Sequence, residues 1–462
     1  MKKKLTFAVF RSVTVIIFIV VTIFAILFAY GYRIDFSDWS ITKTSIVDVA
    51  GPKVDALVSL DGIQYGEVMP FQISNVLPGR HQVTVVKRGF HEWSRPVEVE
   101  EDVVSIVRDV LLVPTNPERY TEAVLSFEPE DVLTFGDGYV LVRKGLPEDA
   151  QLVDNELEVV LIQDDGEISQ EVMSFYEEEF EVLDSFSDDR LFLALANDSY
   201  ALMSLRDRSF DLFSLPSSIV DIQIDVDRRQ LYFRESENLY MKSIEELPTF
   251  LATSFDPDGF ELVRENVSDY DLSSNGTLFF VTNGKLYIKR QGEDKALLVD
   301  HSTGSIDHFE YFSDKALDLM MVFDAVDAQS GNLLSVDEDG LIKVIATDVV
   351  GKPFVNGVGD TLFVSRENVV YLYDEELDVV KNIRTLEEGQ EILGWFDDFG
   401  HFLMKNNQEI LITDVPHYNE FVIVPEAEGL SQLFVKNEAV FWFEEGEESR
   451  DLWRLSWREA LE

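Results

Sequence analysis

Two short acidic turns come nearest, by residue type and spacing, to a metal-binding chemistry. They are "DPDG" (256–259), with Asp256 and Asp258, and "DEDG" (337–340), with Asp337 and Asp339. Calcium prefers several oxygen ligands supplied by a tight turn that contains glycine. Neither turn has the full ligand spacing or the distal glutamate of a calcium loop, and Asp and Gly also favour ordinary turns. The four aspartates are therefore weak calcium candidates, and no other metal site is predicted.

The other residue types that carry catalysis are absent or scattered. The chain has no cysteine, which removes thiolate nucleophiles, disulfides and cysteine-ligated zinc. No histidine belongs to a His-Glu-x-x-His motif or another close ligand pair. The six histidines are His81, His91, His301, His308, His401 and His417. The sequence also lacks a Gly-x-Ser-x-Gly turn and a Walker phosphate loop. We therefore predict no catalytic residue, no cofactor and no enzymatic activity.

The charge of the chain is large, negative and unevenly distributed. The formal net charge is −49. Residues 1–33 hold five basic residues and no acidic one, residues 34–117 have net charge −5, and residues 118–462 therefore carry −49. Such a field repels a phosphate backbone, so we expect no nucleic acid partner. A solvated acidic surface that attracts cations or basic partners is the expected consequence.

An uncharged segment near the N-terminus predicts a membrane anchor. Residues 12–32, "SVTVIIFIVVTIFAILFAYGY", contain no charged residue. A helix of about 20 residues covers the hydrocarbon core of a bilayer. The rival interpretation is a cleaved signal peptide with a small-residue site at 29–31, but the apolar region of such peptides is usually shorter.

The charges that flank this segment predict its orientation. Lys2, Lys3, Lys4 and Arg11 precede it, and Arg33 alone closely follows it. The positive-inside rule then places a basic tail, residues 1–11, in the cytoplasm and the rest of the chain outside. The sequence thus predicts a single-pass protein of the cell membrane, in contact with the lipid bilayer through a transmembrane helix over 12–32.

Residues 33–114 alternate between apolar and polar side chains, which predicts a small β-sandwich of five to seven strands. Residues 58–93 also carry turn, proline and aromatic residues at fixed spacings. These are Asp61, Gly62, Gly66, Pro70, Pro78, Gly79, Lys87, Gly89, Phe90 and Trp93. This pattern resembles the PEGA domain, although Met69 stands where threonine usually precedes the proline and the turn reads "LPGR". The resemblance implies an immunoglobulin-like sandwich on a prokaryotic cell surface, structural roles for these residues, and no catalysis.

Residues 115–462 contain a loose repeat, in which each unit has a polar turn followed by apolar strands. The equivalent apolar positions are Val140, Leu191, Leu231, Leu278, Leu317, Leu362, Phe402 and Val440. A period of about 40–50 residues with several strands per unit predicts a β-propeller. Eight blades are expected, with seven as the alternative, and "TEAVLSF" (121–127) is expected to close the ring by pairing with "SRDLWRLSW" (449–457). The unit around "SSNG" (273–276) resembles TolB-like and WD40-like repeats.

The predicted fold class is therefore mostly β: an N-terminal transmembrane helix, a PEGA-like sandwich and a propeller. The leading hypothesis is a non-enzymatic protein of the prokaryotic cell surface that presents the acidic propeller to an envelope protein or glycan. The alternatives are a propeller enzyme, such as a glycoside hydrolase or lyase, and an assembly factor in the style of TolB. Convergent catalytic groups at one end of the ring would favour the enzyme.

Overall fold

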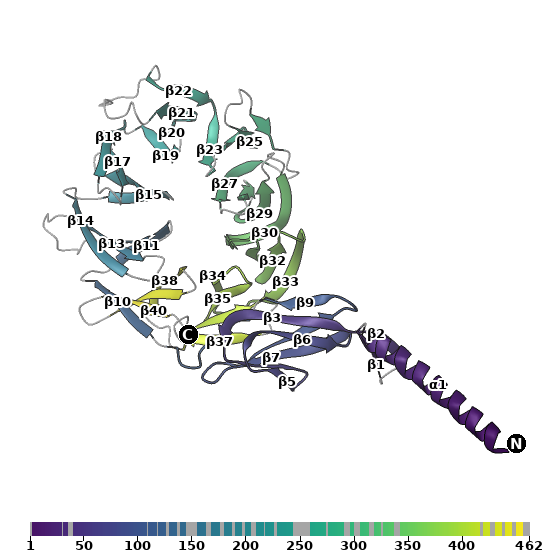
Figure 1. Ribbon diagram of the computed structural model, residues 1–462. Helices are drawn as coiled ribbons and strands as arrows, with labels where there is room; N and C mark the ends of the chain where they lie inside the picture. Colours follow the sequence, from purple (N-terminus) through teal and green to yellow (C-terminus); the bar gives the residue numbers. More distant parts are fainter. Residues whose placement is uncertain are drawn as a thin grey trace.

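A computed structural model gives the structure of the protein. It describes residues 2–29, 31–35, 40–108, 110–117, 119–125, 129–135, 139–144, 155–162, 168–175, 180–186, 190–195, 199–204, 209–216, 218–225, 229–243, 259–273, 276–290, 296–299, 305–313, 318–324, 327–336, 342–415, 419–425, 430–436, 439–445 and 450–455. These residues form one helix, a small two-sheet domain and a ring of sheets (Figure 1).

The N-terminal helix, α1 (Lys2–Ala29), covers most of the predicted uncharged segment but has different bounds. It begins at Lys2 and not at residue 12, because the preceding residues include neither proline nor glycine and Lys and Leu are good helix formers. It ends at Ala29, before Gly31, whose φ of 88° lies outside the helical region. The helix therefore extends beyond the predicted segment 12–32 at the N-terminal side and ends three residues before the end of that segment at the C-terminal side. Within the ranges given above, no helix combines the length and the apolar character that crossing a membrane requires.

A short hairpin of β1 (Tyr32–Asp35) and β2 (Ser40–Lys43) leads into a sandwich of two antiparallel-rich sheets. One sheet has the order β6-β3-β9, with β6 (Met69–Val76), β3 (Ser45–Val54) and β9 (Val104–Val107). The other has the order β5-β4-β7-β8, with β5 (Ile63–Gly66), β4 (Leu57–Leu60), β7 (Gly79–Val86) and β8 (Trp93–Val99). Seven strands agree with the predicted sandwich of five to seven.

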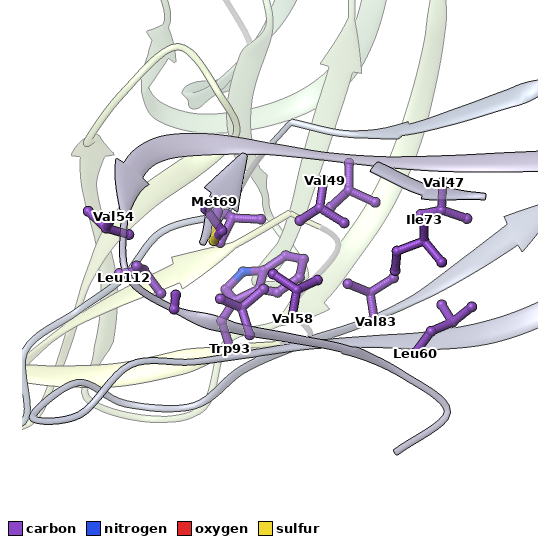
Figure 2. Packing of buried hydrophobic residues seen from close by; sticks show 14 of the residues in the cluster. Val47, Val49, Val54, Val58, Leu60, Met69, Ile73, Val83, Trp93 and Leu112 are labelled. Atoms are coloured by element: carbon purple, nitrogen blue, oxygen red, sulfur yellow. The ribbon is translucent and has the colours of Figure 1, made fainter. Parts of the chain in front are cut away.

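One hydrophobic core fills the space between these two sheets. Figure 2 shows Trp93 of β8 among Val58 of β4, Val49 of β3 and Met69 of β6. Trp93, Val58 and Val49 have no exposed surface. In β7, alternate residues point into this core, since Val83 and Val85 are buried between partly exposed neighbours.

The rest of the chain forms antiparallel sheets that follow one another around a ring (Figure 1). Among the described residues, five of them are sheets of four strands that are consecutive in the sequence. They are β11 (Pro129–Phe135), β12 (Tyr139–Lys144), β13 (Asn155–Ile162), β14 (Ile168–Phe175); β15 (Phe180–Phe186), β16 (Arg190–Leu195), β17 (Ser199–Ser204), β18 (Ser209–Ser214); β19 (Ile219–Asp225), β20 (Gln230–Glu235), β21 (Asn238–Ser243), β22 (Glu261–Arg264); β23 (Val267–Leu272), β24 (Leu278–Thr282), β25 (Lys285–Lys289), β26 (Leu297–Leu298); and β34 (Gln390–Trp395), β35 (His401–Asn406), β36 (Glu409–Asp414), β37 (Glu420–Val424).

Two further sheets complete the ring. One has seven strands: β27 (Ile306–Ser313), β28 (Asp318–Asp324), β29 (Asp327–Val336), β30 (Ile342–Val355), β31 (Thr361–Ser365), β32 (Val369–Asp374) and β33 (Val379–Thr385). The other joins the two ends of the repeat region and has the order β10-β40-β39-β38, with β10 (Arg119–Leu125), β40 (Arg450–Leu455), β39 (Ala439–Glu445) and β38 (Leu430–Lys436). Successive four-stranded units closed in a ring are the architecture of a β-propeller.

The predicted closure of the ring is confirmed. β10 pairs antiparallel with β40, with Thr121 opposite Trp453 and Leu125 opposite Arg450. The predicted equivalence of the repeats is confirmed as well, because the apolar marker residues fall on the second strand of successive units. They are Val140 on β12, Leu191 on β16, Leu231 on β20, Leu278 on β24, Leu362 on β31, Phe402 on β35 and Val440 on β39. Leu317 lies outside the described residues.

Candidate functional site: the joint between the sandwich and the ring

A set of contacts fixes the end of α1 to the sandwich. The guanidinium of Arg33 stacks on the ring of Phe28, 3.4 Å from its centroid, and donates from Nη1 to the Phe28 carbonyl at 2.9 Å. Its Nη2 donates to Oδ1 of Asn75 on β6 at 2.6 Å. Thr44 closes the β1–β2 hairpin, since its backbone N–H donates to the Gly31 carbonyl at 2.9 Å. The helix end therefore has a defined direction relative to the sandwich.

The sandwich in turn packs against the β34–β37 sheet of the ring (Figure 1). His91 stacks on Phe421 of β37, with 5.1 Å between ring centroids. The backbone N–H of Ser94 on β8 donates to Oδ1 of Asn419 at 3.0 Å. These two contacts join residues more than 300 positions apart in the sequence, and we call the residues that make them the joint.

The buried carboxylate of Asp414 fixes the orientation of Asn419. The Asp414 side chain, 1% exposed, accepts the Asn419 backbone N–H at 2.8 Å and its Nδ2 at 2.6 Å. Oγ1 of Thr413 donates to the Asn419 carbonyl at 3.0 Å. The amide oxygen of Asn419 is therefore aimed at the sandwich, because its other polar groups are already paired. A buried charge with two such partners is tolerated, whereas an unpaired one would be costly.

The connecting segment after the sandwich is also fixed on both sides. The N–H of His91 donates to the Val113 carbonyl at 2.8 Å, and the N–H of Thr115 donates to the Gly89 carbonyl at 2.9 Å. The Val113 side chain is fully buried in a cluster with Leu403 of β35 and Trp442 of β39. The segment around "PTNPE" (114–118) therefore begins inside the contact between sandwich and ring.

The joint has little room for a substrate. The space between its residues, about 160 Å³ including open solvent, is too narrow to hold a water molecule. It is lined by Trp93, Leu111, His401, Ile412, Thr413, Asp414, Asn419 and Phe421. Sites for small molecules usually have volumes of about 300–1,000 Å³. Packing and hydrogen bonding are the chemistry that this arrangement supports.

A second polar cluster lies where β19, β23 and β27, the first strands of three consecutive units, approach each other. Oδ2 of the half-buried Asp269 on β23 accepts the Phe309 N–H of β27 at 2.9 Å. On the other side of β23, the Tyr270 hydroxyl donates to the Asp221 carbonyl of β19. Arg234 forms an ion pair with the Asp221 carboxylate and donates to the Val267 carbonyl at 3.2 Å.

Burial changes the acidity of the carboxylates in this cluster. It raises the pKa of Asp269, and it raises the pKa of Asp271 to about 6, with the neighbouring Asp269 charge adding to the effect. Backbone N–H groups of Leu272 and Tyr311 act in the opposite direction on Asp271. The hydrogen bonds and the ion pair of this cluster connect three neighbouring units.

The residues that carry the PEGA resemblance have structural positions. Asp61 and Gly62 form the β4–β5 turn with positive φ, and Asp61 accepts Nδ1 of His81 at 2.7 Å and the Gln82 N–H at 2.8 Å. Trp93 is the centre of the core, and Lys87 lies 4.7 Å from the centroid of the Phe90 ring. A Cβ on Gly66 would come within 2.6 Å of Phe71. Pro70, Pro78, Gly79 and Gly89 lie in or beside the turns and strand starts of the same sandwich.

The predicted calcium candidates Asp256, Asp258, Asp337 and Asp339 lie outside the described residues, as do His301 and His417. The other four histidines have structural partners. His81 pairs with Asp61, His91 stacks on Phe421, His308 stacks on Phe323, and His401 pairs with Asp397 at 2.6 Å. Over the part of the chain that the structure describes, no group of three or more His, Cys, Asp or Glu side chains is arranged to hold a metal.

Residues 44–111 match the PEGA domain family, which confirms the resemblance recognised at 58–93. A comparison with curated proteins finds no match. Solved structures with a similar fold include the C-terminal WD40 domain of Sif2, at 9% identity and TM-score 0.42, covering 74% of this chain and 99% of that one. BamB from Moraxella catarrhalis matches at 9% identity and TM-score 0.40, with 74% and 99% covered. YCF48 bound to D1 peptide matches at 9% identity and TM-score 0.36, with 64% and 92% covered.

Sequence reasoning did not find the joint. The residues that form it are His91 and Ser94, before and at the start of β8, and Asn419 and Phe421, before and within β37. The PEGA pattern at Phe90 and Trp93 adjoins the first segment, but it carries no signal for a contact with the second. The connection between them depends on how the sandwich packs against the ring. The only available signal was the apolar segment "VLLVP" (110–114), which continues directly from the sandwich into the repeat region.

Proposed function

We propose that this protein is a non-enzymatic, membrane-anchored envelope protein that holds an acidic propeller in a fixed orientation and presents it to a protein or glycan partner. The N-terminus lies in the cytoplasm, α1 anchors the chain in the bilayer, and the sandwich and ring lie outside. The matched PEGA domain and the propeller architecture support the coarser conclusion, an extracytoplasmic protein that binds or assembles other molecules.

The surface of α1 supports a lipid environment. Large apolar side chains are exposed on all sides of its second half, including Ile16 at 60%, Phe18 at 71% and Phe28 at 61%. A helix that is apolar all round needs an apolar surrounding, and the sandwich covers only its end. Lys2, Lys3 and Lys4 at the start of the same helix favour the cytoplasmic side.

The observation that carries the proposal is the continuous series of contacts from helix to ring. Arg33, at the end of α1, donates a hydrogen bond to Asn75 of the sandwich. Asn419 of the ring accepts one from Ser94 of the sandwich, and the Val113 side chain is buried among residues of the ring. A flexible tether would need none of these contacts. The helix, sandwich and ring therefore form a support that sets the distance and orientation of the propeller relative to the membrane.

The ring is the expected binding element, and we propose that it has eight blades. The seven-stranded sheet then counts as two blades that share β30, since this strand pairs with β29 through its first half and with β31 through its second. Residues 118–462 carry formal charge −49, which favours partners with a basic surface.

Anchoring is tested by membrane fractionation of the full chain. Ile19→Lys with Ile23→Lys should release the protein into the soluble fraction, whereas Ile19→Leu with Ile23→Leu should not. Because the chain has no cysteine, single cysteines report orientation: a membrane-impermeant maleimide should label Glu98→Cys and not Lys3→Cys in intact cells. Retention of the Lys variant in the membrane, or labelling of Lys3→Cys, would contradict the proposal.

Partner binding is tested by affinity capture with the full chain in detergent. A specific envelope protein or glycan should be recovered, and recovery should weaken as salt rises because the ring is acidic. Hydrolysis of a glycan or peptide by the purified protein, without a recovered partner, would favour a propeller enzyme instead.

A further inference from the structure

Three large apolar side chains are exposed at the tips of three turns of the ring. Val358 is 55% exposed, Leu377 is 62% exposed and Phe399 is 60% exposed. Their turns join β30 to β31, β32 to β33, and β34 to β35. Single exposed apolar residues are common on protein surfaces, but contiguous ones mark interaction sites.

Hydrogen bonds between the turns show that the three tips are neighbours. The Gly357 N–H, next to Val358, donates to Oδ1 of Asp398, next to Phe399, at 2.6 Å. The Glu375 N–H, in the turn of Leu377, donates to Oδ1 of Asp360, in the turn of Val358, at 3.3 Å. The first of these bonds joins the two units that flank the β33–β34 connection. We call Val358, Leu377 and Phe399 the apolar tips.

Each tip is held in place by a side chain of its own turn. The Val358 N–H donates to Oδ1 of Asn356 at 3.2 Å, and the Phe399 N–H donates to Oδ1 of Asp397 at 2.9 Å. The Leu377 N–H donates to Oδ1 of Asp374, also at 2.9 Å. Asn356 is itself buried, at 3% exposure. Apolar groups on fixed turns lose little conformational entropy when a partner covers them, which favours affinity.

The tips lie at the end of the ring that also carries the joint. The Val415 N–H, after β36, donates to the carbonyl of Gly400 in the turn of Phe399 at 2.8 Å. The same β36–β37 connection ends at Asn419, which binds Ser94 of the sandwich. The apolar tips are thus continuous with an interface that the protein already uses.

The surroundings of the tips are acidic. Glu375, Glu376 and Asp398 are exposed in the same turns. A second copy of this chain would bring equal charges together, so self-association at this surface is disfavoured. A partner that has apolar side chains flanked by positive charges complements both the apolar tips and the acidic residues around them.

We propose that Val358, Leu377 and Phe399 form a docking surface for a segment of a partner protein in which apolar side chains are flanked by lysine or arginine. This inference rests on the proposed function and narrows it, because it commits to a protein partner and to one end of the ring.

The probe is a short fluorescent peptide in which leucine and phenylalanine alternate with lysine, and its binding to the full chain in detergent is measured by anisotropy. The combined variant Val358→Ser, Leu377→Ser and Phe399→Ser should bind the peptide about tenfold more weakly or worse, as expected for loss of a hot spot. The matched control is Leu262→Ser, Leu297→Ser and Leu298→Ser, which removes aliphatic residues of 47–51% exposure from β22 and β26. This control should bind like the unaltered protein.

Equal binding by the unaltered protein and the tip variant would overturn the inference, since the peptide would then recognise the acidic field alone. Absence of peptide binding would overturn it too, as would self-association of the full chain that the tip variant abolishes. Circular dichroism on both triple variants establishes that they fold. If affinity capture recovers the same envelope partner with the tip variant as with the unaltered protein, this inference fails while the proposed function stands.

Discussion

The sandwich and the ring bury alternate residues of a strand in different ways. In β7 of the sandwich, Val83 and Val85 enter the single core and the residues between them face outward. In β24 of the ring, all five residues are buried. Phe279 belongs to the cluster shared with the β27 unit, and Phe280 belongs to the cluster shared with the β19 unit.

The two regions therefore depend on their buried side chains for stability in different ways. The sandwich has one core around Trp93, whereas the β23 unit of the ring is covered on both faces and shares one cluster with each neighbour. Damage to the sandwich core should therefore affect the whole small domain. Damage in the ring should remain at the seam between two units, because contacts in such arrays are between nearest neighbours.

Trp93→Ala should have the largest effect. Replacing a fully buried tryptophan leaves a cavity and costs about 4 kcal/mol of unfolding free energy. Hydrogen exchange should accelerate throughout residues 45–107, while the strands of the ring far from the joint stay protected. Trp93→Phe, which retains most of the apolar volume, should cost much less. Protection that is lost only beside residue 93 would contradict the idea of a single cooperative core.

Phe279→Ala and Phe280→Ala should each cost about 3 kcal/mol, in different places. Phe280→Ala should increase exchange around Leu239 and Val267, whereas Phe279→Ala should increase exchange around Met320 and Leu334. The two variants serve as controls for each other, because they remove the same side chain from adjacent positions. Identical exchange patterns would show that the seams are not independent.

The same contrast explains how much of the fold could be predicted from the sequence. The alternation at Val83 and Val85 and the Asp61-Gly62 turn are local signals, so the sandwich could be predicted. The marker residues of the ring stand in continuous apolar runs such as "LFFV" (278–281), which are typical of strands buried on both faces. Their regular spacing predicted a ring, and the pairing of β10 with β40 confirmed its closure.

The joint and the apolar tips could not be predicted in this way. Gly357 and Asp398 are 41 residues apart, and Ser94 and Asn419 are 325 residues apart. Asn356 and Asp397 each accept a backbone N–H of their own turn, but which turns meet depends on the packing of neighbouring units. Long-range contacts of this kind have no local sequence signal.

The pH dependence of stability, through Asp271, tests the contact between β23 and β27. The pKa of Asp271 is raised from 3.8 to about 6, so its contribution to stability is fully present below pH 3.8 and is lost as the pH rises through about 6. The raised pKa corresponds to a loss of about 2 kcal/mol of unfolding free energy as Asp271 ionises, after allowance for the partial exposure of this side chain. Asp271→Asn should remove this slope.

The measurement is urea unfolding at several pH values between 4 and 7. The difference in unfolding free energy between Asp271→Asn and the unaltered protein should shift in favour of the variant as the pH rises. Glu261→Gln, at an exposed position of β22, is the control and should follow the unaltered protein. A constant difference across this range would mean that Asp271 does not titrate within the seam.

Asn419→Ala should have the smallest effect on stability and the most specific effect on architecture. It removes the acceptor of the Ser94 N–H and one donor to Asp414, at a cost of about 1 kcal/mol. The two regions keep their own cores, so exchange should accelerate at the Ser94 amide while Val83 and Phe402 stay protected. Asn382→Ala, at an exposed position of β33, should leave the Ser94 amide unchanged. If the Ser94 amide exchanges at the same rate with and without the Asn419 side chain, this hydrogen bond does not hold the sandwich against the ring, and the orientation of the propeller must depend on Val113 and the His91–Phe421 stack.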